Sequence, residues 1–477
     1  TEPSCSRAQE PASAGMADPS SEQVSSTIAS KAFVALLAIA AVVGVVVSLA
    51  AWSFLELVYQ IQQGVFVHLP SDLGYHNGPP LWWSLPVLAI AGVIVAFAIV
   101  RLPGRGGHIP AEGLAVGGGP TQPIQLPGIL LAAFAAIGLG VVVGPEAPLI
   151  ALGSGLAVAA VGLARRDVEP QVLALVAAAG SFAALSFIFT SPLIAAVILI
   201  EAIGMGGPRL TLVLLPGLLA AGIGTLVSIG MGSWTGLSTG SYALGSLSLP
   251  SFARPDIAQF GWAIALAIVI AVVTVMIVRG GRATERVVAS RLFLLLPLVG
   301  LIVGGLAIAF SQASGKGVNE VLFSGQSALP GLVANAGTWS LSALALLIAF
   351  KGLAYALSLG GFRGGPTFPA LFLGAAAGIM AGHLPGFSIT PAVAVGMGAA
   401  FVAVLKLPLS AVVVATLLTF KAGPGAEPLI IVGVVVAYVV ATLLSELGTA
   451  KPASANGDET TASQAPAAVV APGSAAH

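Results

Sequence analysis

Long apolar runs, separated by short stretches rich in glycine, proline and charge, fill most of the chain. They lie at roughly 32–58, 82–101, 126–143, 149–164, 171–204, 210–231, 259–278, 292–310, 340–362, 368–383, 389–405, 407–420 and 427–446. A helix needs about 20 apolar residues to cross a membrane, yet several of these runs are shorter and end at Gly or Pro. The run 171–204 is interrupted by Thr190-Ser191-Pro192. Because short and broken helices at membrane depth are tolerated only inside protein or along a cavity, the pattern predicts an all-α polytopic membrane protein of the transporter or channel type.

The two ends of the chain differ from this apolar middle. Residues 1–28 are rich in Ser, Ala, Glu and Pro, and residues 449–477 are also polar and lack apolar periodicity. Segments of this composition cannot bury enough apolar surface to fold. We therefore expect disordered tails at 1–28 and 449–477 around a membrane domain at 29–448.

The overall composition agrees with a membrane location. Hydrophobic residues make up 57% of the chain and charged residues 8%, whereas soluble domains carry about 25% charged residues. The surplus of apolar surface must face lipid. We expect a multi-pass integral protein of the plasma membrane, with the lipid bilayer as its surroundings.

Charge and chemistry exclude several other classes. The net charge is zero and no basic stripe is present, so nothing suggests a nucleic-acid partner. Cys5 is the single cysteine, and the five histidines are dispersed without a metal-binding motif. We expect no disulfide framework, no metal and no cofactor.

The densest group of basic residues separates two apolar runs, and it consists of Arg279, Arg282, Arg286 and Arg291. Loops rich in Lys and Arg remain on the cytoplasmic side of membranes. This loop is therefore predicted to be cytoplasmic.

An internal repeat divides the chain into halves at about 84–231 and 259–420. Residues 144–153 (GPEAPLIALG) resemble residues 365–374 (GPTFPALFLG), 221 positions later. A second echo, at a spacing of 216, pairs Gly180, Ala183, Ala184, Pro192, Leu193 and Ala195 with Gly396, Ala399, Ala400, Pro408, Leu409 and Ala411. A fainter third echo pairs residues 106–108 with 316–318. Duplicated halves are a recurrent transporter plan, with the substrate site where broken helices of the two halves meet.

The shared GPxxP pattern predicts helix starts inside the membrane. Proline is well tolerated in the first turn of a helix, so Pro148 and Pro369 are expected to open helices. A helix N-terminus presents free N–H groups and roughly half a positive charge. Converging ends of this kind form an anion site without a lysine, and a partial charge also lets the ion leave. The predicted substrate is a small anion.

These motifs resemble those of the CLC family of chloride channels and proton/chloride exchangers. The family patterns GSGIP, GREGP and GxFxP resemble residues 106–110 (GGHIP), 144–148 (GPEAP) and 365–369 (GPTFP), and a fourth similarity runs from Ala184 to Glu201. The resemblance spans about residues 30–446. It implies two inverted-topology repeats of broken and tilted helices, and a homodimer with one pore in each subunit. The anion-binding residues it implies are Gly107, His108, Ile109, Gly144, Pro145, Ala147, Thr367 and Phe368.

Glu146 takes the place of the gating glutamate of the family. A carboxylate at the mouth of an anion site can fill that site as a tethered anion, and protonation would release it. The alternative is a glutamate that only complements the helix dipole. Because a charge inside a membrane costs about 2.5–3.5 kcal/mol, we favour the gating role.

Three departures from the family patterns affect the predicted anion selectivity. Gly107 stands where the family usually has a serine whose hydroxyl contacts chloride, so the preference for chloride over other anions is open. His108 could donate to the anion or sense pH, or it could be satisfied by local backbone. Pro366 removes one N–H from the third segment, and Thr367 could supply a hydroxyl or its own amide instead.

Two further departures concern proton coupling. The resemblance places the inner proton-relay glutamate at Ala202, and Glu201, the possible proton pathway here, is one residue and about 100° away on a helix. Glu201 could equally be a structural carboxylate. The inner-gate tyrosine of the family corresponds to Ser454. These losses favour channel-like or weakly proton-coupled conduction.

Other functions remain alternatives. The same fold could exchange protons for anions by using Glu201 or water. Lys351, Arg363 and Lys406 could raise the local anion concentration, although a structural role is equally compatible, with Lys351 snorkelling to the interface or paired to a carboxylate. An intramembrane enzyme or a cation carrier is a remote possibility, because no nucleophile–base pair and few embedded carboxylates are present.

Overall fold

The computed structural model describes residues 21–447 except 115–118, 165–167, 205–206, 208 and 238–241. Its longer helices are α1 (Ser21–Ile28), α2 (Lys31–Gln63), α4 (Ser84–Arg101), α5 (Leu126–Gly138), α6 (Glu146–Ala164), α7 (Pro170–Phe189), α8 (Pro192–Ile203), α9 (Arg209–Thr235), α10 (Ile257–Val288), α11 (Leu292–Ser314), α12 (Leu329–Ala334), α13 (Leu341–Gly361), α14 (Thr367–Ala381), α15 (Ile389–Leu405), α16 (Pro408–Leu418) and α17 (Glu427–Leu447). The described residues form no strand, which confirms the predicted all-α class.

Helix lengths follow the mixture that the apolar runs predict. Within the described ranges, nine helices are long and apolar enough to cross a membrane, and five apolar helices are shorter, including α8, α14 and α16. The break predicted at Thr190-Ser191-Pro192 separates α7 from α8: Thr190 is left-handed (φ 49°), and the Ser191 hydroxyl accepts a hydrogen bond from the amide of Ile194 at 3.4 Å.

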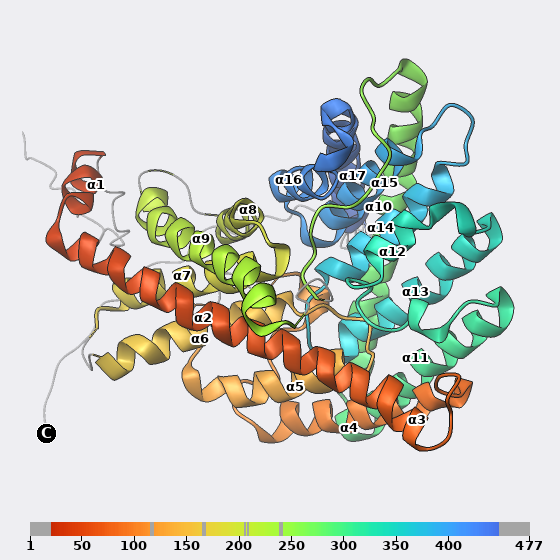
Figure 1. Ribbon diagram of the computed structural model, residues 1–477, viewed down its shortest axis with the longest axis horizontal. Coiled ribbons are helices and arrows are strands. Elements are labelled where there is room, and N and C mark those ends of the chain that lie inside the picture. The colour runs from red at the N-terminus through yellow and green to blue at the C-terminus, as the bar shows by residue number, and fades with distance from the viewer. Residues whose placement is uncertain are drawn as a thin grey trace, which may run out of the picture.

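The two halves of the sequence lie beside each other (Figure 1). In that view α6 to α9, in yellow and yellow-green, occupy one side, and α10 to α17, in green to blue, the other. Contacts join the halves: α4 packs on α11, and the short helices α8 and α16 pack on each other. The core between the halves therefore contains the short helices.

The repeat is visible in the backbone as two equivalent helix crossings. A methyl group on Gly153 of α6 would lie 2.4 Å from the carbonyl oxygen of Gly180 in α7, and one on Gly374 of α14 would lie 2.3 Å from that of Gly396 in α15. Only glycine permits such close approach. These positions are equivalent at the spacings found in the sequence, so the same crossing was built twice.

The N-terminal segment differs in part from the prediction. Residues 21–28, expected to be disordered, form helix α1, which contacts α2 and α9. Val24 is buried and Ile28 packs against the core. These two side chains are four residues apart and thus share one helix face; the polar composition concealed this short apolar face. The rest of the two predicted tails, 1–20 and 449–477, lies outside the described residues.

Candidate functional site

The two GPxxP segments meet at the centre of the molecule. The amide of Gly144 donates to the carbonyl oxygen of Gly365 at 2.7 Å, and the amide of Gly365 donates to that of Gly144 at 2.6 Å. This antiparallel pairing of equivalent residues means that the segments run in opposite directions about a local two-fold axis, as inverted repeats require. The halves are thus joined at the sequence motif that they share.

Glu146 lies on top of this junction. It is the first residue of α6, and its side chain is 1% exposed. Its Oε1 atom accepts a hydrogen bond from the amide of Thr367, the first residue of α14, while Oε2 is buried without a hydrogen-bond partner among the described residues. The carboxylate of one half therefore covers the helix N-terminus of the other half, where an anion would be stabilised.

Glycine at 144 and 365 makes room for this carboxylate. A methyl group on Gly365 would lie 2.0 Å from Cδ of Glu146, and one on Gly144 would lie 2.1 Å from Oε2. Neither distance is possible between non-bonded atoms. Gly144 and Gly365 are required by the side chain that rests on them.

The start of α14 is held from two sides. Tyr355, fully buried in α13, donates its hydroxyl to the carbonyl oxygen of Pro366 at 2.5 Å. Phe368 is 1% exposed and stacks on Phe189 of α7, with ring centroids 5.2 Å apart. Pro148 and Pro369 lie in the first turns of α6 and α14, two residues after each helix begins. Thr367 and Phe368 are thus in rigid surroundings. Tyr355 is not among the site residues predicted from the sequence, although a tyrosine inside an apolar run is a signal of a buried polar contact.

Residues 106–110, the first of the three motif segments, do not open a long helix as the two GPxxP segments do. Pro110 opens only the short 3₁₀ turn η3 (Pro110–Glu112), preceded by Ile109 as its N-cap. A ring nitrogen of His108 (Nε2) lies 3.1 Å from the carbonyl oxygen of Gly113, and the other nitrogen lies 3.9 Å from the Glu112 carboxylate. The expectation that local backbone satisfies His108 is the one the geometry supports.

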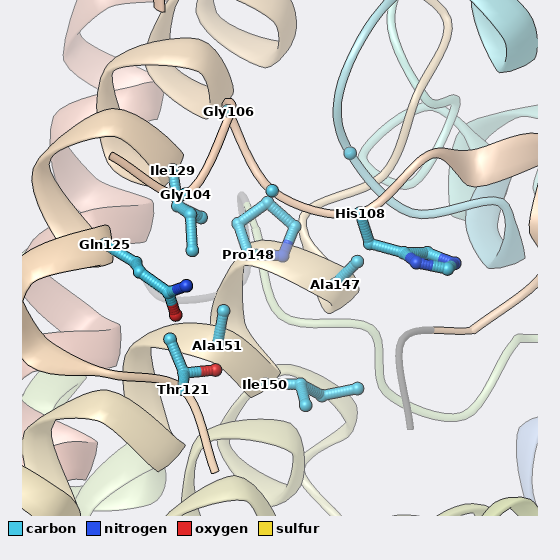
Figure 2. Close-up of a pocket in the computed structure, with 12 residues that line it drawn as sticks. Gly104, Gly106, His108, Thr121, Gln125, Ile129, Ala147, Pro148, Ile150 and Ala151 are labelled. Atoms are coloured by element: carbon cyan, nitrogen blue, oxygen red, sulfur yellow. The ribbon is translucent and has the colours of Figure 1, made fainter. Parts of the chain in front are cut away.

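A cavity of about 180 Å³ separates the first segment from α6 (Figure 2). Gly107, His108 and Ala147 belong to its lining, together with Thr121 and Gln125. Figure 2 shows the imidazole of His108 pointing away from Thr121 and Gln125. The structure brings three predicted anion-binding residues to this cavity, whereas Glu146, Thr367 and Phe368 gather at the neighbouring junction.

Arg363 connects the first and third segments. It is 8% exposed and donates to the carbonyl oxygens of Arg105, at 3.4 Å, and Phe362, at 3.2 Å. Burial lowers its pKa to about 10, against the opposing charges of Glu285 and Glu112. An arginine with this pKa remains a cation at neutral pH, so a positive charge is fixed beside the first segment.

Glu201 is committed to another helix. Its Oε1 accepts from the amide of Leu409 at 2.9 Å, and Oε2 accepts from the amide and the hydroxyl of Ser410 at 2.7 and 2.6 Å. Glu201 therefore caps the N-terminus of α16. The structure brings it to α16 rather than to Glu146.

Ala202, the residue after Glu201, faces a second, larger cavity of about 560 Å³. Ala202 is part of its wall, which also contains the basic side chains of Arg279, Arg282, Arg286 and Lys406. We call this cavity the basic vestibule. The resemblance places a proton-relay glutamate at position 202. Ala202 faces a cavity large enough to hold water, but its methyl side chain cannot carry a proton. Ser454, the other departure concerning coupling, lies outside the described residues.

Lys351 is fully buried and does not snorkel, and it forms no ion pair by contact with the described residues. Its amino group is fully buried and donates to four consecutive carbonyl oxygens, those of residues 320–323, at 2.9–3.2 Å. It also lies 4.5 Å from the ring centroid of Phe372 in α14. Phe323 in turn donates its amide to Gly140 at 2.9 Å, in the loop that leads to Gly144. Through Phe323 and Gly140, Lys351 thus stabilises the loop that leads to the paired residues Gly144 and Gly365.

Comparisons with known proteins agree with this geometry. The family model described as "Voltage gated chloride channel" matches residues 89–442. The chain is 30% identical over 353 residues to the "Putative ion-transport protein YfeO" of Escherichia coli O1:K1, covering 72% of this chain and 78% of that protein. The same identity and coverage hold for YfeO of Escherichia coli strain CFT073.

Solved structures share the fold at lower identity. A slow cyanobacterial Cl⁻/H⁺ antiporter superposes with a TM-score of 0.70 at 22% identity, covering 86% of this chain and 94% of that one. A CLC-type fluoride/proton antiporter gives a TM-score of 0.65 at 18% identity, covering 86% and 96%. These likenesses show the arrangement of helices.

Proposed function

Because the chain belongs to the voltage-gated chloride channel family, we propose that it transports chloride or a similar small anion across the membrane through a pore gated by Glu146. The observation that carries this proposal is the position of the Glu146 carboxylate on the amide of Thr367. A side-chain anion already occupies a helix N-terminus built for a free anion.

Protonation supplies the gate with a physical trigger. The ionised carboxylate is attracted to the positive end of α14, and its burial is opposed by the unpaired Oε2 atom. Neutralising the carboxyl group removes this attraction, so the side chain can leave and a free anion can take its place. We therefore expect anion flux to rise as the pH falls.

Coupling to protons is proposed to be weak. The wall of the basic vestibule carries Ala202, which has no titratable group, and Glu201 is engaged by three donors of α16. The carboxylate in the described lining, Glu112, lies beside His108 rather than at the Ala202 position, so the expected relay position itself offers no proton-carrying group. Conduction is then channel-like.

Tight proton/anion exchange is the second candidate. It is favoured by the antiporters among the structural neighbours, one for chloride and one for fluoride. In this chain the inner proton route would use Glu201 or water in the basic vestibule. A homodimer, implied by the family resemblance, and a plasma-membrane location, expected from the composition, are predictions of the same proposal.

The test is to record chloride flux and internal pH together in proteoliposomes. Glu146→Gln removes the charge and is expected to make flux insensitive to pH. Glu427→Gln is the matched control, because Glu427 also opens an apolar helix but is exposed. If chloride flux drives protons against their gradient, the protein is an exchanger rather than a channel-like conductor. Absence of any anion flux would overturn the proposal.

A further inference from the structure

The basic vestibule is larger and more cationic than a halide requires. Five separate parts of the chain line it: α10, the stretch 111–114, the end of α8, the end of α15 with residues 406–407, and the end of α17 (their helices are labelled in Figure 1). Its volume of about 560 Å³ lies in the range of small-molecule sites, roughly 300–1,000 Å³. A cavity of this size can hold a polyatomic ligand.

Three of the cations belong to the same part of α10. Arg279, Arg282 and Arg286 are spaced by three and four residues, which places their side chains on one helix face. Like charges at this spacing destabilise a helix. Glu285, the carboxylate within this stretch, is not part of the vestibule lining and also acts electrostatically on Arg363. A multivalent anion between the arginines would relieve their repulsion.

Lys406, at the end of α15, adds a fourth positive charge to the lining. It ends α15 in the left-handed conformation (φ 60°), and its Nζ atom is buried without a hydrogen-bond partner among the described residues. Burial, and after it the charge of Arg282, lower the pKa of Lys406. An unpaired buried amino group carries a desolvation cost, which an anionic ligand would offset.

Basic side chains outnumber acidic ones among the described residues that line the vestibule. Among the residues that line the vestibule, Glu112 is the acidic one; its side chain is 56% exposed and lies 3.9 Å from His108. Arg279 is held at the end of α17 by the carbonyl oxygen of Leu444. The described lining therefore contains four basic side chains and one acidic one, and Arg279 is held by a backbone contact.

We propose that the basic vestibule binds a multivalent phosphate group on the cytoplasmic side, and that the bound phosphate obstructs anion passage. Arginine forks match phosphate oxygens in pairs, and lysine adds a point charge. The phosphate can belong to a soluble compound or to a lipid headgroup, which share this chemistry. Binding goes beyond transport, whereas obstruction rests on the proposed function.

The binding test uses inorganic pyrophosphate and the full-length protein in a neutral detergent, followed by calorimetry at constant ionic strength. The double variant Arg282→Gln/Lys406→Gln is expected to weaken binding at least about tenfold. The control Arg254→Gln/Arg291→Gln removes the same charge from exposed positions outside the vestibule and is expected to stay within about twofold of wild type. Equal losses in both variants, or no saturable binding in wild type, would overturn the proposal.

Two further measurements test whether the phosphate belongs to a lipid or to a soluble compound, and whether its binding slows anion flux. In phosphatidylcholine nanodiscs, added phosphatidic acid weakens pyrophosphate binding if a lipid headgroup fills the vestibule and leaves it unchanged if the ligand is soluble; both results support a phosphate site. In proteoliposomes, pyrophosphate on the vestibule side is expected to slow chloride flux in wild type but not in the double variant. Retained flux with pyrophosphate bound would overturn obstruction alone, and no flux in any sample would instead contradict the proposed transport.

Discussion

Glu146 and Thr367 occupy equivalent positions in the two halves, 221 residues apart, and the side chain of the first binds the backbone amide of the second. At the local two-fold axis that relates the halves, the two equivalent positions therefore carry different residues with different roles. One half supplies a tethered carboxylate, and the other supplies the helix N-terminus that receives it. The gate that we propose requires this asymmetry, since a second glutamate at position 367 would place two like charges at the junction.

The space beneath the carboxylate gives the first prediction. Gly365→Ala places a methyl group where Cδ of Glu146 lies, at 2.0 Å, so the carboxylate can no longer rest on α14. We expect chloride flux at neutral pH to rise toward that of Glu146→Gln, with a weaker pH dependence. Proteoliposome flux at several pH values measures this. Gly331→Ala is the control, because no atom lies within 4 Å of the added methyl; a folded Gly365→Ala protein with wild-type gating would contradict the role of the junction.

The vestibule wall gives a prediction about coupling. Ala202→Glu adds a carboxylate at a position that faces the basic vestibule, and we expect proton movement coupled to chloride flux to increase. Glu201→Gln is expected to leave coupling unchanged and to lower stability by roughly 1–3 kcal/mol, because it weakens the cap of α16. Simultaneous pH and chloride recording, with thermal unfolding of each variant, provides the measurement. Loss of coupling in Glu201→Gln would identify Glu201 as the relay instead.

Lys351 gives a prediction about stability. Lys351→Met keeps a similar volume but leaves the carbonyl oxygens of residues 320–323 without their shared donor. Loss of a buried partner costs roughly 1–3 kcal/mol, so the unfolding temperature should fall. Thermal unfolding in detergent measures the change. Lys421→Met is the control because Lys421 is exposed; an equal shift in both variants would show that Lys351 does not support the junction.

His108 gives a prediction about pH and stability. Burial lowers the pKa of His108, opposed by the charge of Glu112 and the hydrogen bond to Gly113. The unfolded chain then binds a proton more readily than the folded one, so His108 makes stability fall as the pH drops through about 6.5, the ordinary histidine value. In His108→Gln this part of the pH dependence should disappear. Unfolding temperatures at neutral and mildly acidic pH measure it, with the exposed His76→Gln as control; an unchanged pH slope in His108→Gln would be the contrary result.

Much of the architecture could be predicted from local pattern. The apolar runs anticipated the helices, and Thr190-Ser191-Pro192 marked the break between α7 and α8, because helix length and proline effects depend on neighbouring residues. The echo of residues 144–153 in 365–374 identified the repeat. Helix α1 was not predicted, because its apolar face consists of only Val24 and Ile28 within a polar stretch that was expected to be disordered.

The partners of the charged side chains could not be predicted in the same way. Glu201 and Leu409 are 208 residues apart, and Arg363 and Arg105 are 258 apart. No periodicity reports such contacts, since they depend on how helices pack. For this reason the role of Glu201 stayed open, and Tyr355 was not expected to hold Pro366.

The sequence by itself determined that this is a membrane protein of duplicated halves, with paired helix starts and a glutamate at one of them. Composition and spacing suffice for this, because they act through the solvent and through residues a few positions apart. Only the tertiary structure decided that Glu146 covers the amide of Thr367, that Glu201 caps α16, and that Lys406 lines the same cavity as the arginines of α10. These relationships arise where distant segments converge in a low-dielectric interior, in which every polar group takes whichever partner packing places within reach.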